Sequence, residues 1–278
     1  MMPARFLALL RGEGKRLLRS RTTYAFAAMA LILALATILS SPDEQNALLF
    51  MVAGDDPNRV GGAVGFIGNL VDADDVAGSA ARTSLVFTML WIPSVIIYAV
   101  VTTAQDYTSA SYSVSKARGV SDAASVLSKL AARGAFCCLT YIAFNGMAFA
   151  FKLIQYGGPV SLAGIACFAL PAALGAIVLA ALLAEASALY LLTRSATAAS
   201  IIAVALSLFV MAWFPSTYVE GAGAGSPILY LSPVFYLMNV CALCFQTVGA
   251  SEVLLYAAVT IPVMCLVSVG ALKLKEVF

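Results

Sequence analysis

The stretch from Leu162 to Leu183 carries no charged, hydroxyl or amide side chain. A helix of about 20 such residues crosses the roughly 30 Å hydrocarbon core of a bilayer. Lipid offers the backbone no hydrogen-bond partners, so a chain can cross it only as helices or as a closed barrel. The run is continuous rather than alternating, which favours a helix. Because 62% of all residues are hydrophobic and the mean hydropathy is +0.95, we predict an all-α integral membrane protein with one transmembrane domain over residues 1–278.

The same criterion predicts six membrane-spanning helices along the chain. They lie at Tyr24–Leu39, Thr83–Thr103, Gly134–Ile154, Leu162–Leu183, Ala196–Phe214 and Val253–Leu272. A seventh apolar stretch, Ile228–Phe245, is weaker and contains Pro233. A seventh crossing would place the C-terminal lysines outside, so we expect residues 216–250 to form a re-entrant hairpin that enters from the outer face and is broken at Pro233.

The charges are distributed unevenly, and their distribution predicts the topology. The N-terminal segment holds one acid, Glu13, and six basic residues: Arg5, Arg11, Lys15, Arg16, Arg19 and Arg21. The following loop, residues 41–82, is acidic, with Asp43, Glu44, Asp55, Asp56, Asp72, Asp74 and Asp75. The positive-inside rule therefore predicts a multi-pass protein of the cell (plasma) membrane with both termini in the cytoplasm. Leucines among the basic residues of segment 1–22 predict an elbow helix that lies in the cytoplasmic interface of the bilayer.

Several chemistries are excluded by the residues that the sequence lacks. There is no histidine, which removes Ser-His triads and His-ligated zinc, and there is no G-x-x-x-x-G-K-[ST] phosphate loop. We therefore expect a chain that is not an enzyme, binds no cofactor or metal itself and has no nucleic-acid partner. The six cysteines fall in apolar segments, where packing is the better interpretation, with a metal or redox role for Cys241 and Cys244 as the alternative.

The polar segment 106–129 between the second and third predicted spans carries the one motif-like pattern. Its sequence is DYTSASYSVSKARGVSDAASVLSK. It resembles the segment after the second span in membrane (permease) subunits of type-2 ATP-binding-cassette exporters, which carries an acid and an aromatic residue, Gly-Thr two residues later, then Gly-x-Ser-Arg and a lysine seven residues on. Asp106, Tyr107, Gly119, Ser121 and Lys129 match this pattern in register. Gly-Thr is replaced by Ala110 and Ser111, and the arginine by Asp122.

The resemblance implies that segment 106–129 is a cytoplasmic coupling helix that docks on a separate ATPase subunit. The residues expected at that contact are Asp106, Tyr107, Tyr112, Val114, Lys116, Gly119, Ser121, Asp122 and Lys129, with Tyr112 and Val114 as its apolar anchors. In such exporters two permease subunits, identical or paralogous, pair above two ATPases. ATP and Mg would then be bound by the partner chain, and this chain would move an amphipathic or hydrophobic substrate such as a peptide, lipid or drug outward.

Two polar residues within the apolar spans are candidates for a functional role. Glu185 lies at the inner end of the fourth predicted span, where it would pair with an arginine of the elbow helix or else contact substrate. Asn145, in the third predicted span, would bond to a neighbouring helix or contact substrate. Three alternatives remain open: a secondary transporter, a non-transporting membrane anchor of a resistance or signalling complex, and a segment 106–129 that is merely a solvated connection.

Overall fold

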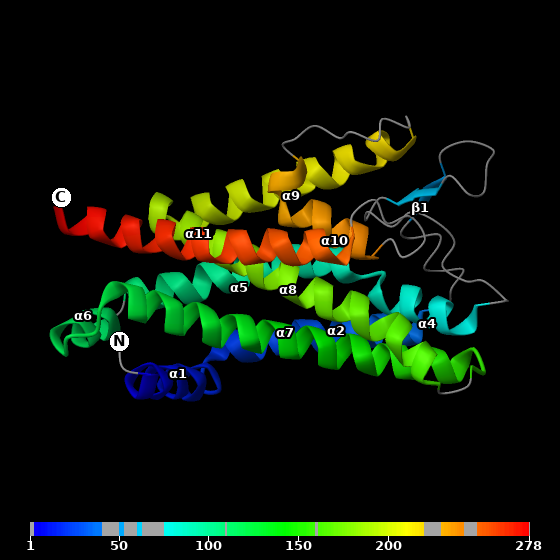
Figure 1. Ribbon diagram of the computed structural model, residues 1–278, viewed down its shortest axis with the longest axis horizontal. Coiled ribbons are helices and arrows are strands. Elements are labelled where there is room, and N and C mark those ends of the chain that lie inside the picture. The colour runs from blue at the N-terminus through cyan, green and yellow to red at the C-terminus, as the bar shows by residue number, and fades with distance from the viewer. Residues whose placement is uncertain are drawn as a thin grey trace.

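The computed structural model describes residues 3–40, 50–52, 60–62, 75–108, 110–158, 161–219, 229–241 and 249–277, and its long helices lie side by side in an elongated bundle (Figure 1). In chain order the helices are α1 (Pro3–Leu17), α2 (Arg21–Leu39), α4 (Val76–Leu85), α5 (Thr88–Thr108), α6 (Ala110–Ala117), α7 (Asp122–Gln155), α8 (Leu162–Thr193), α9 (Ala196–Val219), α10 (Pro233–Cys241) and α11 (Ala250–Val277). A 3-10 turn, η1 (Leu229–Leu231), precedes α10. The predicted helical class is confirmed for the bundle.

Among the residues that the structure describes, five helical segments are long and apolar enough to cross a membrane. They are Arg21–Leu39, Val76–Tyr107, Asp122–Gln155, Leu162–Thr193 and Ala250–Leu274, and each covers one of the predicted spans. Helix α9 stands where the remaining span was predicted, but its described apolar part, Ala196–Met211, is shorter than the others. The structure thus supports a multi-pass membrane protein, and a sixth crossing by α9 stays a prediction.

Several helices begin earlier than predicted because polar residues cap them. The Oγ of Ser121 accepts a hydrogen bond from the backbone N of Ala124 (3.3 Å) and starts α7, well before the predicted span. The Asp75 carboxylate accepts from the N of Gly78 (2.8 Å) and starts α4 within the acidic stretch. Apolar length locates the part of a helix that lies in lipid, whereas the cap decides where the helix begins.

The acidic stretch predicted to lie outside contains a small strand pair that the sequence did not predict. β1 (Phe50–Val52) runs antiparallel to β2 (Val60–Gly62), with Met51 opposite Gly61. The other residues of the stretch before Asp75 lie outside the described part of the chain. The pair is a local addition to an otherwise helical fold, since antiparallel strands joined by a short connection can pair locally.

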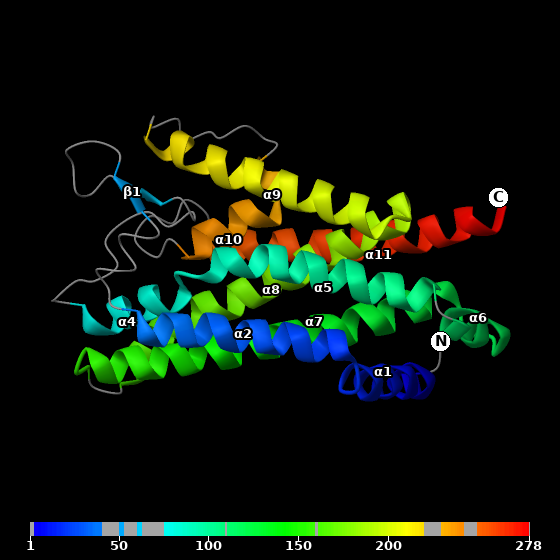
Figure 2. The same cartoon turned by 180° about the vertical axis from the view of Figure 1, so that it is seen from behind.

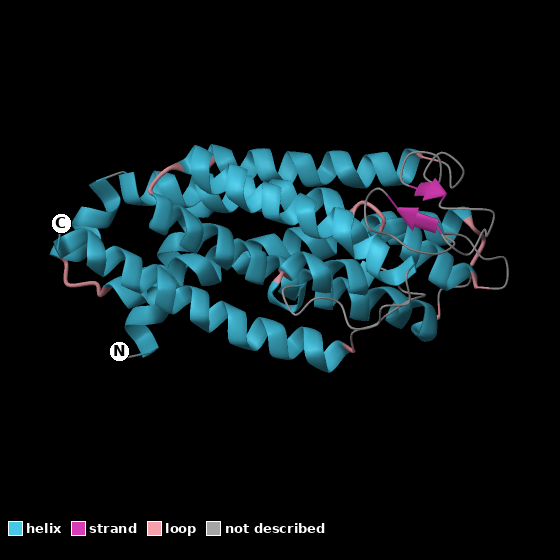
Figure 3. Cartoon of the chain, turned by 90° about the horizontal axis from the view of Figure 1, so that it is seen from above, coloured by secondary structure: helices cyan, strands magenta, loops and turns pink. Residues whose placement is uncertain are grey.

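The bundle has two distinct ends. Helices α1 and α6 and the C-terminus lie at one end, as Figures 1 and 2 both show. The strands, the start of α4, the end of α7 and the start of α8 lie at the other end, and Figure 3 shows the strands opposite both termini. This arrangement groups together the segments that the charge pattern assigns to the cytoplasm. Which end faces the cytoplasm stays a prediction.

Helix α8 packs against α5, α7, α9, α10 and α11 and is the central element of the bundle. On α5, the ring of Trp91 meets that of Tyr141 of α7 edge to face at 5.0 Å. The Tyr141 hydroxyl is hydrogen-bonded to Thr88 (2.9 Å), and a Cβ on Gly175 of α8 would come within 2.9 Å of it. A residue without a side chain at position 175 therefore allows α7 and α8 to approach closely.

Helices α8 and α9 are joined by two residues only. Arg194 adopts a left-handed conformation (φ 56°) that ends α8, and its backbone N donates to the carbonyl of Tyr190 (2.7 Å). The Oγ of Ser195 then accepts from the N of Ala198 (3.2 Å) and caps α9. From this joint, α9 diverges from the bundle toward the end where the strands lie (Figure 1).

The predicted re-entrant hairpin is represented by η1 and α10. Pro233 does not break a helix there: it is the first residue of α10, where a missing N–H costs nothing. Val234, Leu237 and Met238 of α10 are buried, and the helix packs on α8, α9 and α5. Residues 220–228 and 242–248 lie outside the described part of the chain, so the two sides of the hairpin stay a prediction.

Candidate functional site

The predicted coupling segment forms a short helix, α6, that turns back onto the start of α7. Gly119 takes a left-handed conformation (φ 76°) after the helix, and its N donates to the carbonyl of Lys116 (2.9 Å). The Tyr112 hydroxyl donates to the Asp122 carboxylate (2.7 Å), and its ring lies 4.9 Å from that of Tyr107. These contacts make α6 a defined element rather than a loose connection.

Burial and the hydrogen bond to ionised Asp122 raise the pKa of Tyr112 above its usual value. The phenol therefore keeps its proton through the physiological range and remains the donor to Asp122. Tyr112 is thus engaged within its own chain. Its role as an anchor for a partner stays a prediction, and a partner would have to displace this contact or use only the exposed part of the ring.

The structure separates the nine predicted contact residues into three groups. Exposed side chains or backbone are found at Val114, Lys116, Gly119 and Ser121, while Tyr107, Tyr112 and Asp122 are half-buried. The two residues at the ends of the motif, Asp106 and Lys129, are buried. Lys129 also lies inside α7 rather than in a loop. Both side chains are therefore engaged within this chain, and their expected part in a partner contact stays a prediction.

Asp106 instead lies at the centre of a cluster of charged side chains, which we call the ionic cluster (Glu13, Arg16, Asp106, Lys129 and Arg133). One carboxylate oxygen of Asp106 is hydrogen-bonded to Arg16 of α1 and the other to Arg133 of α7. The Nζ of Lys129 lies 3.1 Å from Asp106 and 3.0 Å from Glu13. Arg16 and Glu13, one helical turn apart, are 2.8 Å from each other.

The ionic cluster joins three helices, α1, α5 and α7, where α5 leaves the apolar part of the bundle. Arg133 also donates to the Thr103 hydroxyl (2.9 Å), which in turn bonds to Ser187 of α8 (3.2 Å). Ionised groups removed from water are costly unless they are paired and hydrogen-bonded, and here the acids and bases meet at several contacts. The cluster therefore fixes the positions of α1, α5 and α7 relative to one another, with α8 reached through Thr103.

The charges of the ionic cluster do not cancel. Three basic groups, Arg16, Lys129 and Arg133, surround two acids, Glu13 and Asp106, which leaves one net positive charge. Burial would lower the pKa of Arg16, but its bond to Asp106 and the charges of both acids outweigh burial and raise it. Arg16 stays ionised, which keeps α1 attached to α5.

The other two predicted residues have partners different from those expected. Glu185 does not pair with an arginine of α1: its Oε1 accepts from the Tyr256 hydroxyl of α11 (2.8 Å). The elbow arginine, Arg16, pairs with Asp106 instead. Asn145 was expected to bond to a neighbouring helix, but its Nδ2 donates to the carbonyl of Tyr141 (2.9 Å), one turn back in α7. Asn145 is therefore satisfied locally.

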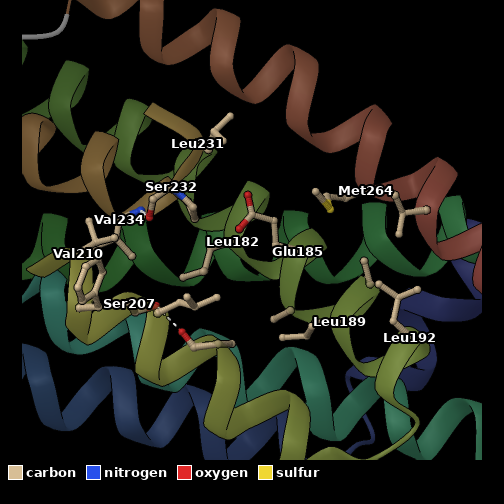
Figure 4. Close-up of a pocket in the computed structure, with 17 residues that line it drawn as sticks. Leu182, Glu185, Leu189, Leu192, Ser207, Val210, Leu231, Ser232, Val234 and Met264 are labelled. Carbon is tan, nitrogen blue, oxygen red and sulfur yellow. Dashed lines mark hydrogen bonds between the residues drawn. The ribbon is translucent and has the colours of Figure 1, made fainter. Parts of the chain in front are cut away.

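Glu185 also lies on the wall of a cavity of about 570 Å³ between α8, α9, α10 and α11. Figure 4 shows Glu185 together with Leu182 of α8, Ser232 just before α10 and Met264 of α11, which line the same cavity. The size lies in the range of roughly 300–1,000 Å³ that small-molecule sites occupy in proteins. The sequence contained one signal for this site, an acid inside an apolar helix, but the cavity arises only from tertiary packing.

Within the described ranges the structure holds no group of three or more histidine, cysteine, aspartate or glutamate residues suited to a metal ion. Cys137, Cys138, Cys167 and Cys265 are free thiols. The side chain of Cys241 and all of Cys244 lie outside the described part of the chain. A scan against protein-family models found no match, and a search of curated proteins found no significant relative.

Proposed function

We propose that this chain is the membrane subunit of an ATP-driven exporter, coupled through α6 to an ATPase on a separate polypeptide. The proposal rests on the resemblance of segment 106–129 to type-2 ATP-binding-cassette permeases and on the chain's lack of a nucleotide-binding motif. The observation that carries it is α6 itself: a short polar helix at one end of the bundle, anchored at its base by the ionic cluster.

The contacts at the base of α6 support a mechanical role. A force on α6 would pass through Tyr107 and Asp106 into α5, and through Asp122 into α7. Asp106 would also pass it to α1 through Arg16. Buried side chains that are linked by hydrogen bonds and ion pairs move together rather than independently. A partner that moves α6 would therefore move α1, α5 and α7 as a unit.

The proposed assembly contains two permease subunits, identical or paralogous, and two ATPase subunits that bind ATP and Mg. In it α1 is the elbow helix in the cytoplasmic interface, and α9 crosses the membrane as the fifth of six spans. ATP closes the ATPase pair, α6 follows, and an amphipathic or hydrophobic substrate is moved outward. The protein would lie in the plasma membrane with α6 and both termini in the cytoplasm.

Val114 is the residue of choice for a test, because its side chain is 46% exposed and engaged in no hydrogen bond that its loss could disturb. A photo-crosslinking amino acid at position 114 should capture a protein that contains a phosphate loop and hydrolyses ATP. Val114→Asp should abolish copurification of that ATPase and the stimulation of its activity by this chain, because a buried charge is costly in an interface. Lys116→Glu should have a smaller, salt-dependent effect.

Val114→Ala is the matched control, since it shortens the side chain without adding charge, and it should retain most of the stimulation. Tyr112→Asp is unsuitable, because it would break the bond to Asp122 within this chain. The proposal fails if position 114 captures no ATPase, or if Val114→Asp retains full stimulation. Substrate movement by vesicles containing this chain alone would instead indicate a secondary transporter. Stimulated hydrolysis without any transport would indicate a non-transporting anchor.

A further inference from the structure

The cavity between α8, α9, α10 and α11 combines an apolar wall with a single acid. Its lining is made mostly of leucine, alanine, valine, methionine and phenylalanine side chains. Its two serine hydroxyls are hydrogen-bonded to backbone atoms close in sequence. Ser207 donates to the carbonyl of Ala203 (2.8 Å), and the Oγ of Ser232 accepts from the N of Val234 (3.3 Å). Among the described lining residues, Glu185 alone brings a formal charge.

The Glu185 carboxylate is only partly satisfied by the protein. Oε1 accepts from Tyr256, which orients the group, while across the described residues Oε2 meets no hydrogen-bond donor. None of the lining residues within the described ranges is a lysine or arginine. Arg16 of α1 and Lys129 and Arg133 of α7 are instead paired with Asp106 in the ionic cluster. An ionised acid inside a lipid-embedded helix is costly, so a cationic group on a ligand would offset this cost by pairing with the Glu185 carboxylate.

We propose that this cavity binds an amphipathic molecule that has an apolar tail and one cationic ammonium head. The tail fills the leucine-rich wall, and the ammonium lies against Glu185 as its counter-ion. An anionic head would be repelled by the same carboxylate, and a neutral lipid would leave its charge uncompensated. That such a cation is the transported substrate rests on the proposed exporter function, whereas its binding to this chain does not.

A pair of matched probes tests the charge preference on the unmodified protein. Dodecyltrimethylammonium and dodecyldimethylamine oxide have the same tail and similar heads, but at mildly alkaline pH only the first carries a net charge. Binding of each would be measured by isothermal titration to the full chain in lipid nanodiscs, below the concentrations at which the probes form micelles, with empty nanodiscs subtracted. We expect saturable binding of the cation at least tenfold tighter than that of the amine oxide.

Variants then assign the preference to the cavity. Glu185→Gln keeps the shape of the side chain and should reduce affinity for the cation at least tenfold while leaving the amine oxide nearly unchanged. Ala203→Leu fills the cavity and should weaken both probes. Glu252→Gln, which removes an exposed acid from the start of α11, is the matched control and should bind as the unmodified chain does.

Three results would overturn the proposal: equal affinity for the two probes, no saturable binding of either, or an equal loss of cation binding in Glu252→Gln and Glu185→Gln. The probe comparison does not depend on any variant, so it remains decisive if Glu185→Gln fails to fold. All these measurements use the chain without an ATPase. Binding without ATP-driven transport in a reconstituted assembly would thus refute the exporter function but not the binding site. Transport without binding of the cation would refute the binding site but not the exporter function.

Discussion

Replacing Asp106 by asparagine should destabilise the protein strongly, because Asp106 is the shared partner of three basic groups. The substitution keeps the size of the side chain but removes the charge that faces Arg133 and Lys129, which are only 1% and 6% exposed. Breaking a buried ion pair on one side typically costs about 3–5 kcal/mol. Arg16 adds little to this figure, because its side chain is 40% exposed and keeps its contact with Glu13.

The free energy of unfolding would be measured by titrating the purified chain in mixed micelles with dodecyl sulfate and following helix content. We expect a loss of about 3–5 kcal/mol for Asp106→Asn, and about 1 kcal/mol or less for Glu13→Gln, because Glu13 is 18% exposed and its partners Lys129 and Arg16 both keep their contact with Asp106. Adding Arg133→Met to Asp106→Asn should restore part of the loss, since an apolar side chain leaves no charge uncompensated.

A loss below about 1 kcal/mol for Asp106→Asn would refute this reasoning, because it is the value expected for solvated surface pairs. It would mean that water reaches the ionic cluster. The absence of any rescue by Arg133→Met would also count against it, since the cost would then come from the shape of the site rather than from the charge of Arg133.

Other predictions concern α6, the core and the topology. Tyr112→Phe should cost about 1 kcal/mol by loss of one hydrogen bond and should raise amide hydrogen exchange in α6, while exchange in α8 stays unchanged. Gly175→Ala should destabilise the chain by about 1–3 kcal/mol in the same titration, because the added methyl meets the hydroxyl of Tyr141 at 2.9 Å. Gly134→Ala should be tolerated, since its nearest new contact is an ordinary 3.8 Å. A cysteine at Ser115, on a cysteine-free background, should react with an impermeant maleimide only after cells are opened, and labelling of intact cells would overturn the assignment of α6 to the cytoplasm.

The apolar spans were accessible to prediction because a membrane helix satisfies its backbone internally and must be apolar over a fixed length. For the same reason the run around Leu162 located α8. The polar start of α7 was not found, because Lys129 and Arg133 look like residues of a solvated loop. Their spacing of four residues does place them on one helix face. Reading that spacing together with Glu13 and Arg16, three residues apart in α1, was the available signal for the ionic cluster.

The partners of the individual polar residues could not be predicted, since they depend on how the helices pack. Glu185 was expected to meet an arginine and meets Tyr256, which is distant in sequence. Asn145 was expected to bridge helices and bonds within its own. In both cases the sequence identified a costly polar group in an apolar helix, whereas the identity of its partner depends on the rotation of each helix against its neighbours.

The two-residue joint at Arg194 and Ser195 has a consequence for how the Glu185 cavity can admit a ligand. Because α8 ends at Thr193 and α9 begins at Ala196, the two helices cannot separate at this point without unwinding a cap. The cavity lies between them, and α9 diverges from the bundle toward its opposite end (Figure 1). A widening of the cavity would therefore be a rotation of α9 about Arg194, which opens the cavity toward the end of the bundle where the strands lie.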